Sequence, residues 1–226
     1  MMRPPFQGSA VALVTPFTQD GVDFPALDRL IDFQLANGTD AIVALGTTGE
    51  PSTMTDREWE EVVDRCVQRI AGRVPLIAGT GGNDTRKTIL KARRAKELQA
   101  DYQLCVTPYY NKTTQQGLIA HYTAVAEDGA LPVIVYNVPG RTGLNMQPET
   151  LYALAGHENI AAMKEASGNL SQIIEMVRLC RDKIAFYSGN DDQVAPLMSL
   201  GFQGVISVAA NLAPGLDRVY IDSHFF

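Results

Sequence analysis

Cysteine and histidine are scarce in this chain of 226 residues, and each shortage excludes a class of protein. The three cysteines, Cys66, Cys105 and Cys180, are odd in number and lie within apolar patterns. They indicate buried free thiols in a reducing compartment rather than the disulfide framework of a secreted protein. The three histidines are too dispersed along the sequence for a metal site, so we expect no bound metal ion.

The chain also lacks long apolar runs and an excess of positive charge. No run approaches the about 20 residues that a membrane-spanning helix needs, and residues 1–6 lack the apolar core of a signal peptide. The formal net charge of -6 disfavours a nucleic acid or an anionic membrane as partner. We therefore expect a cytoplasmic protein, and we interpret the basic cluster at residues 86–96 as a solvated helix face.

Nucleotide-binding and acyl-transfer motifs are absent as well. Residues 79–82 form a glycine-rich segment, but they lack the Rossmann spacing and the Lys-Ser/Thr pair of a phosphate loop. The chain contains no Gly-x-Ser-x-Gly elbow, which would present a nucleophilic serine. We expect the protein to need no cofactor.

What the chain does contain is a regular alternation of short apolar runs and longer helical patterns. Near-continuous apolar runs of this length are typical of parallel strands that are buried on both faces. The eight predicted strands are Ala10–Thr15, Ala41–Leu45, Pro75–Ala78, Tyr102–Val106, Pro132–Tyr136, Ile160–Lys164, Ile184–Ser188 and Gly204–Val208.

Helix signals fill the segments between these strands. Thr55 and Glu58 have the spacing of a capping box, which predicts the start of a helix. Pro25 predicts the first turn of an earlier helix, and Asn37-Gly38 predicts its end. Eight alternating units indicate an α/β fold of the (β/α)8 TIM-barrel type, rather than an open sheet. We expect one barrel domain over residues 1–226.

Polar side chains gather where the predicted strands end. Thr47 and Thr48 follow the second strand, and Tyr110 follows the fourth. Arg141 lies in a Pro-Gly-Arg-Thr-Gly turn after the fifth strand, and Gly189 follows the seventh. Barrel enzymes build their sites from the C-terminal ends of the strands, so these residues predict one site at one rim.

Lys164 closes an apolar run and opens the polar stretch Glu165–Gly168. A low-dielectric position disfavours the ammonium form of lysine and lowers its pKa toward the neutral amine. A neutral amine attacks carbonyl carbon, so Lys164 is a candidate Schiff-base lysine. The alternative is a lysine that buries its stem at a strand end and keeps its charged group in water.

Two other residue types suit imine chemistry. Tyr136 ends the strand before the one that carries Lys164, and a phenol both donates and accepts a proton. Its alternative role is packing inside the barrel. Thr47 and Tyr110 extend a possible hydroxyl relay toward solvent, although a threonine between glycines also stabilises turns. Arg141 presents a fork that binds a carboxylate with two hydrogen bonds, unless it is a plain surface arginine.

Four motifs in this order resemble the dihydrodipicolinate synthases, also called 4-hydroxy-tetrahydrodipicolinate synthases, and the resemblance runs from about Gly8 to about Leu216. It implies a TIM barrel that condenses pyruvate with L-aspartate 4-semialdehyde to 4-hydroxy-tetrahydrodipicolinate. This lyase reaction belongs to the diaminopimelate route to lysine and uses a class I aldolase mechanism. The four motifs are Gly46–Glu50, Tyr109–Lys112, Tyr136–Gly143 and Lys164–Gly168.

The resemblance also implies a role for each candidate residue. Lys164 would form the pyruvate Schiff base, and Tyr136 would be the general acid and base. Thr47 and Tyr110 would complete the proton relay, with Tyr110 reaching in from a neighbouring subunit of a homodimer or homotetramer. The substrate-binding residues would be Thr48 and Ile206 against pyruvate, Gly189 in the pocket wall, and Arg141 at the carboxylate of the semialdehyde.

Two alternatives belong to neighbouring classes of protein. Sialic acid lyases and 2-keto-3-deoxy sugar acid aldolases share the lysine and the tyrosine, but they do not usually show the Pro-Gly-Arg-Thr-Gly turn. The other alternative is a non-catalytic barrel that serves as a regulator or scaffold. The presence of Lys164, Tyr136, Thr47 and Arg141 argues against it.

The end of the chain departs from the family pattern. The family continues past the barrel into a C-terminal helical region, which we expect to be missing or truncated here. Residues 217–226 are β-branched and aromatic and therefore form helices poorly. We expect a short or altered last helix and, because apolar surface would stay uncovered, lowered stability.

Overall fold

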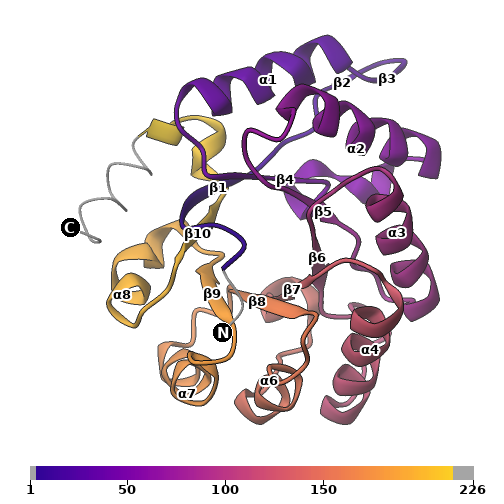
Figure 1. Ribbon diagram of the computed structural model, residues 1–226. Helices are drawn as coiled ribbons and strands as arrows, with labels where there is room; N and C mark the ends of the chain where they lie inside the picture. Colours follow the sequence, from indigo (N-terminus) through magenta and orange to yellow (C-terminus); the bar gives the residue numbers. More distant parts are fainter. Residues whose placement is uncertain (1–3, 216–226) are drawn as a thin grey trace.

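Eight parallel strands close into a barrel in the computed structural model, which describes residues 4–215 (Figure 1). Neighbouring barrel strands follow the order β1-β10-β9-β8-β7-β6-β5-β4, and β4 pairs with β1 to close the ring. Of the eight pairs of neighbouring strands, seven consist of barrel strands that follow one another along the chain, as right-handed strand-helix-strand units require. The predicted (β/α)8 fold is confirmed.

The strands form at the predicted places. The barrel strands are β1 (Gly8–Ala12), β4 (Ala41–Ala44), β5 (Leu76–Gly79), β6 (Tyr102–Val106), β7 (Val133–Asn137), β8 (Ile160–Glu165), β9 (Ala185–Ser188) and β10 (Gly204–Ser207). Most bounds agree with the prediction within one residue, but β1 begins two residues earlier and ends three residues earlier. A two-stranded hairpin, β2 (Phe17–Thr18) with β3 (Gly21–Val22), was not predicted.

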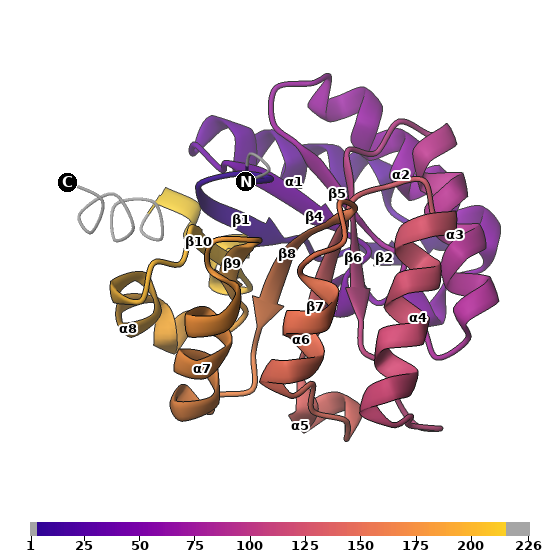
Figure 2. The same cartoon turned by 60° about the horizontal axis from the view of Figure 1, so that its bottom comes forward.

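Helices surround the barrel as an outer ring (Figures 1 and 2). They are α1 (Phe24–Ala36), α2 (Asp56–Ile70), α3 (Thr85–Glu97), α4 (Gln115–Asp128), α5 (Pro139–Thr142), α6 (Pro148–Leu154), α7 (Leu170–Cys180) and α8 (Val194–Ser199). Short 3-10 turns lie at Thr47–Gly49, Pro51–Thr53, Asp191–Gln193 and Ala209–Asn211.

Local sequence explains where these helices begin. Thr55 accepts a hydrogen bond from the backbone N–H of Glu58, and the Glu58 carboxylate accepts one from the Thr55 N–H. This is the predicted capping box, and it satisfies two N–H groups that a helix start leaves unpaired. Pro25 lies in the first turn of α1, and Asn37 caps the C-terminus of this helix, also as predicted. The three cysteines are buried and free.

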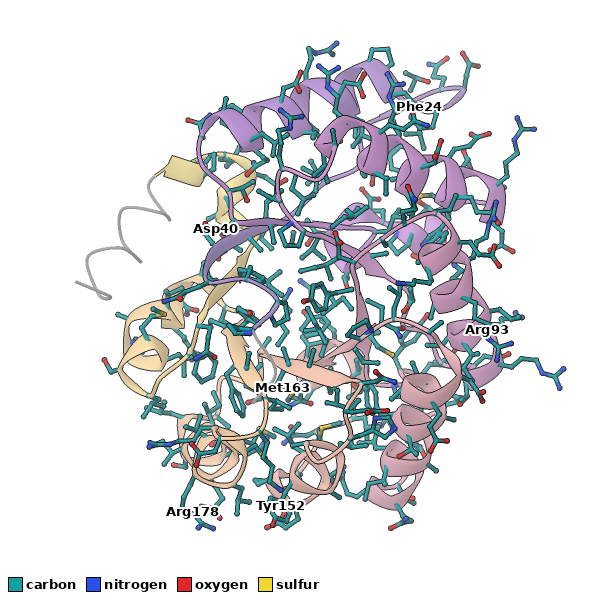
Figure 3. The ribbon with its side chains drawn as sticks, viewed as in Figure 1. Phe24, Asp40, Arg93, Tyr152, Met163 and Arg178 are labelled. Atoms are coloured by element: carbon teal, nitrogen blue, oxygen red, sulfur yellow. The ribbon has the colours of Figure 1, made fainter. Side chains whose placement is uncertain are left out.

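Side chains fill the barrel interior, so it is a core rather than a pore (Figure 3). Alternate residues of each strand point inward, and the others pack against the helices. The inner cluster contains Phe6, Ala10, Ala12, Ala41, Val43, Ile77, Leu104, Ile134, Tyr136, Val138, Ala162, Tyr187 and Ile206.

Two surface predictions have different outcomes. The basic cluster lies on α3, where Figure 3 shows Arg93 projecting away from the barrel, so its interpretation as a solvated helix face is confirmed. The prediction for residues 217–226 lies outside the described residues. Within residues 4–215, no helix combines the length and the apolar character that crossing a membrane requires.

Candidate active site

Lys164 and Tyr136 occupy matched positions on two neighbouring strands. They are direct register partners between β8 and β7, so their side chains leave the same face of the sheet. That face is the barrel interior, because Tyr136 belongs to the inner cluster. The Lys164 Nζ lies 4.4 Å from the centroid of the Tyr136 ring. The strand register therefore brings the two predicted residues into contact.

Burial controls the protonation state of Lys164. Its side chain is only 5% exposed, and the loss of hydration lowers the pKa of the amine to about 8. The carboxylate of Asp191 opposes this shift, whereas the guanidinium of Arg141 adds to it. Near neutral pH, the neutral, nucleophilic fraction of Lys164 is therefore much larger than that of an ordinary lysine, although it is still the minor form.

Tyr136 keeps its proton over the same pH range. Its side chain is 7% exposed, and burial raises the pKa of the phenol. The positive charge of Arg141 lowers that pKa, and the negative charge of Glu165 raises it. The phenol is therefore a protonated group beside a partly neutral amine, which is the arrangement that proton transfer between them needs.

Gly189 and Ile206 come from the next two strands around the barrel. A methyl group built on Gly189 would lie 2.9 Å from Lys164 Cε and 2.8 Å from Ala166 Cβ, so only glycine leaves room for the lysine stem. Ile206 lies on β10 inside the barrel, in the same cluster as Tyr136. Gly189 thus lies close to the stem of Lys164, and Ile206 lies in the barrel interior. Their contacts with substrate stay a prediction.

A cavity of about 820 Å³ opens at the C-terminal ends of β4, β5, β6 and β7, and Lys164, Gly189 and Ile206 are not part of its lining. Thr47, Tyr136 and Arg141 all line it, together with the apolar side chains of Leu104, Val106 and Val138. Thr48 follows Thr47 in the 3-10 turn after β4 and is half-buried, but it is not part of the lining. The cavity continues outward between α2 and α3.

The segment that carries Arg141 is a short helix rather than the predicted turn. Pro139 opens α5, whose four residues follow directly after β7 (Figure 2). The hydroxyl of Thr142 donates to the carbonyls of Val138 and Leu144, and it accepts a bond from Thr107. These hydrogen bonds hold Thr142 in place, and they therefore restrain the backbone that carries the Arg141 side chain.

Tyr110 does not join the other candidates in this chain. Its side chain is 89% exposed, and it does not line the cavity. Its φ of 67° is a backbone conformation that side chains other than glycine seldom adopt. Within residues 4–215, no hydrogen bond connects Tyr136 with Thr47 or Tyr110. The predicted relay is therefore not assembled within one chain.

Asp191 is a charged neighbour that the sequence did not reveal. Its carboxylate acts on the amine of Lys164 and also accepts hydrogen bonds from the N–H groups of Val208 and Ala209. It joins the segments that follow β9 and β10. Its position two residues after Gly189, at a strand end, was the only available signal.

Comparison with known proteins identifies the family. Residues 5–224 match the dihydrodipicolinate synthetase family. The chain is 54% identical over 209 residues to 4-hydroxy-tetrahydrodipicolinate synthase 1 of Clostridium acetobutylicum, covering 92% of this chain and 71% of that relative. The chain belongs to the dihydrodipicolinate synthetase family. The predicted resemblance is confirmed.

Solved structures agree with this assignment. The chain superposes on dihydrodipicolinate synthase from Aquifex aeolicus with a TM-score of 0.95 and 46% identity, covering 97% of this chain and 75% of the other. A dihydrodipicolinate synthase from Acinetobacter baumannii, complexed with pyruvate, gives a TM-score of 0.94 at 44% identity, with 97% and 76% coverage. The relatives thus extend beyond the length that this chain spans.

Proposed function

We propose that Lys164 forms a Schiff base with pyruvate, to which the chain then adds L-aspartate 4-semialdehyde. The condensation to 4-hydroxy-tetrahydrodipicolinate is the reaction of the family to which the chain belongs, so the activity predicted from the sequence is confirmed. The assignment of individual residues is our proposal. One observation carries it: a buried lysine of lowered pKa lies against a buried tyrosine, and that tyrosine lines a cavity.

The first half of the reaction needs an amine and a proton shuttle. Neutral Lys164 Nζ attacks the C2 carbonyl carbon of pyruvate, and the carbonyl oxygen leaves as water after it has gained two protons. The ring of Tyr136 lies 4.4 Å from the Lys164 Nζ, and its hydroxyl both gives and takes a proton, so it serves this step. Loss of a proton from the methyl carbon of the imine then produces the nucleophilic enamine.

The second half needs recognition of another carboxylate. The enamine attacks the aldehyde carbon of the semialdehyde, whose oxygen becomes a hydroxyl group when it is protonated. The amino group of the same substrate then attacks the imine carbon, closes the ring and releases Lys164. Arg141 lines the cavity and supports a two-bond contact with the carboxylate of the semialdehyde. A sugar aldehyde offers no such carboxylate beside its aldehyde.

Tyr110 supports a homo-oligomer of two or four chains. Its ring is exposed, its backbone adopts a strained conformation, and it does not line the cavity of its own chain. Each of these observations is explained if Tyr110 enters the site of a second copy. In that arrangement it completes the relay that Thr47 and Tyr136 begin.

Trapping with borohydride tests the proposal directly. Borohydride reduces an imine but leaves a free lysine unchanged, so incubation with pyruvate should add one reduced pyruvyl group to Lys164, as read by peptide mass spectrometry. Lys164→Ala should abolish the adduct and keep the fold. Lys183→Ala, which removes a half-buried lysine beside Tyr152, is the matched control and should retain the adduct. An adduct on another lysine, or none in folded protein, would refute the mechanism.

A further inference from the structure

A buried polar network lies on the outer side of the two strands that carry the reacting pair. Glu165 and Asn137 directly follow Lys164 and Tyr136, and they are also register partners between β8 and β7. Because side chains alternate along a strand, these two point away from the barrel interior. They are 1% and 0% exposed. A carboxylate in such a place needs hydrogen-bond donors, and the proposed reaction does not use it.

Donors surround the Glu165 carboxylate. The backbone N–H of Ser167 donates to Oε1 over 2.5 Å, and the amide nitrogen of Asn137 donates to Oε2 over 3.1 Å. Burial raises the pKa of Glu165, and the bonds from Ser167 and Asn137 oppose that shift. Since both neighbours present N–H groups, the site is shaped for an acceptor at both oxygens.

Asn137 connects this carboxylate to the loop that carries Arg141. Its amide nitrogen also donates to Asn145 Oδ1 over 2.9 Å, and its Oδ1 accepts the backbone N–H of Met146 over 3.0 Å. Asn137 precedes α5, and residues 145–146 follow it. One side chain therefore joins the two ends of the segment that carries Arg141.

The far end of the same segment is anchored to α7 and α4. Asn145 and Gln172 exchange two side-chain hydrogen bonds of 2.7 and 3.1 Å. The Gln115 side chain donates to the backbone carbonyl of Asn145 and accepts from the Gln147 N–H. Residues 143–147 are thus held from three sides, and Glu165 is the charged member of the network.

We propose that Glu165 is a positioning residue for the second substrate: it orients Asn137, which closes the Arg141 segment and aims the guanidinium at the cavity. The inference rests on the proposed function, because it gives Arg141 the carboxylate of the semialdehyde as its target. Glu165 touches neither substrate. Its action reaches the reaction through Asn137 and the backbone of residues 138–146.

Replacement by glutamine is the sharpest test. Glu165→Gln keeps the shape but turns one acceptor into a donor, which must face the N–H of Ser167 or of Asn137. We expect the KM for L-aspartate 4-semialdehyde to rise about tenfold, equivalent to about 1.4 kcal/mol. The KM for pyruvate should stay within about twofold of the native value, and trapping at Lys164 should persist.

A double substitution separates positioning from general loss of stability. In an Arg141→Ala background, Glu165→Gln should add no further increase in the KM for the semialdehyde, because both changes act on one contact. A purely structural role would make the two effects additive. Loss of the Glu165 charge should lower the pKa of Tyr136 in either case, so this shift is no test of positioning.

Gln103→Leu is the matched control. Gln103 is as deeply buried as Asn137, and its side chain is hydrogen-bonded to Thr80 and to the Leu131 carbonyl. It lies near the start of β6, whereas Arg141 follows the end of β7. It should lower the melting temperature and leave both KM values unchanged. If Glu165→Gln does not fold, Asn145→Ala, at a half-buried position, gives the same selective rise in KM on a smaller scale.

The outcomes are distinguishable. Equal rises in both KM values, no rise, or an effect that adds to that of Arg141→Ala would overturn the positioning role, while native trapping at Lys164 would leave the proposed function intact. Failure of the native protein to trap pyruvate would overturn the proposed function itself.

Discussion

The two halves of the site are built in different ways. The proposed pyruvate side consists of Lys164 and Tyr136, which backbone pairing between β7 and β8 makes register partners. The proposed semialdehyde side consists of Arg141 on a four-residue helix, outside the sheet. Its position depends on side-chain hydrogen bonds from Thr142 and Asn137. The strands thus position the Lys164–Tyr136 pair, whereas a network of polar side chains positions Arg141.

The difference predicts how each half responds to substitution. A residue on a strand keeps its place when a neighbour changes, because many backbone hydrogen bonds hold it. A residue on a short segment shifts its side chain when one buried polar group changes, because few hydrogen bonds hold the segment. Substrate recognition should therefore be sensitive at a distance, whereas imine formation should respond only to changes that touch Lys164 or Tyr136.

The largest effect is expected at the strand side. Tyr136→Phe removes the hydroxyl and keeps the ring that covers Lys164, so kcat should fall by about 10²–10⁴ with little change in stability. Steady-state kinetics with both substrates measures this. Tyr152→Phe, at an exposed position on α6, is the control. A fall of less than about threefold would mean that another group moves the proton.

A smaller and more selective effect is expected at the loop side. Arg141→Ala should lower kcat/KM for the semialdehyde about 10- to 150-fold, because a charge-assisted contact of about 1.5–3 kcal/mol is lost. Borohydride trapping of pyruvate should be unaffected. Arg178→Ala removes an exposed arginine of α7 and should change neither property. Loss of trapping together with turnover would show that the two halves are not separable.

The smallest effect tests the packing around the amine. Gly189→Ala would place a methyl group 2.9 Å from Lys164 Cε, so the lysine must shift and imine formation should slow about tenfold. The trapping rate with excess pyruvate measures this. Gly156→Ala is the matched control, since nothing lies within 4 Å of its added methyl group. Equal rates in the two variants would contradict the close contact.

The same contrast separates what the sequence could predict from what it could not. The barrel, its eight strands and the Lys164–Tyr136 contact follow from the spacing of apolar runs and from the rule that barrel sites lie at strand ends. The hairpin β2–β3 was not predicted, because strands of two residues are too short to show an alternation of apolar and polar residues. The short helix α5 was not predicted, because a Pro-Gly sequence is typical of turns.

The polar network around Glu165 and Asn137 was not predicted, for a different reason. Glu165 and Asn137 are 28 residues apart, and their contact exists only after the barrel has brought β7 beside β8. Nothing in the local sequence distinguishes a buried glutamate from an exposed one.

The central claim is that burial makes Lys164 a nucleophile, and the pH dependence of imine trapping tests it most directly. The pKa of Lys164 is lowered from its ordinary 10.5 to about 8, so the neutral fraction grows as the pH rises through that value. The initial rate of adduct formation with saturating pyruvate should rise between pH 6 and 9 and then level off, with a midpoint near the lowered pKa. A rate that continues to climb up to the ordinary pKa of lysine would show that the amine is not perturbed and would contradict this account.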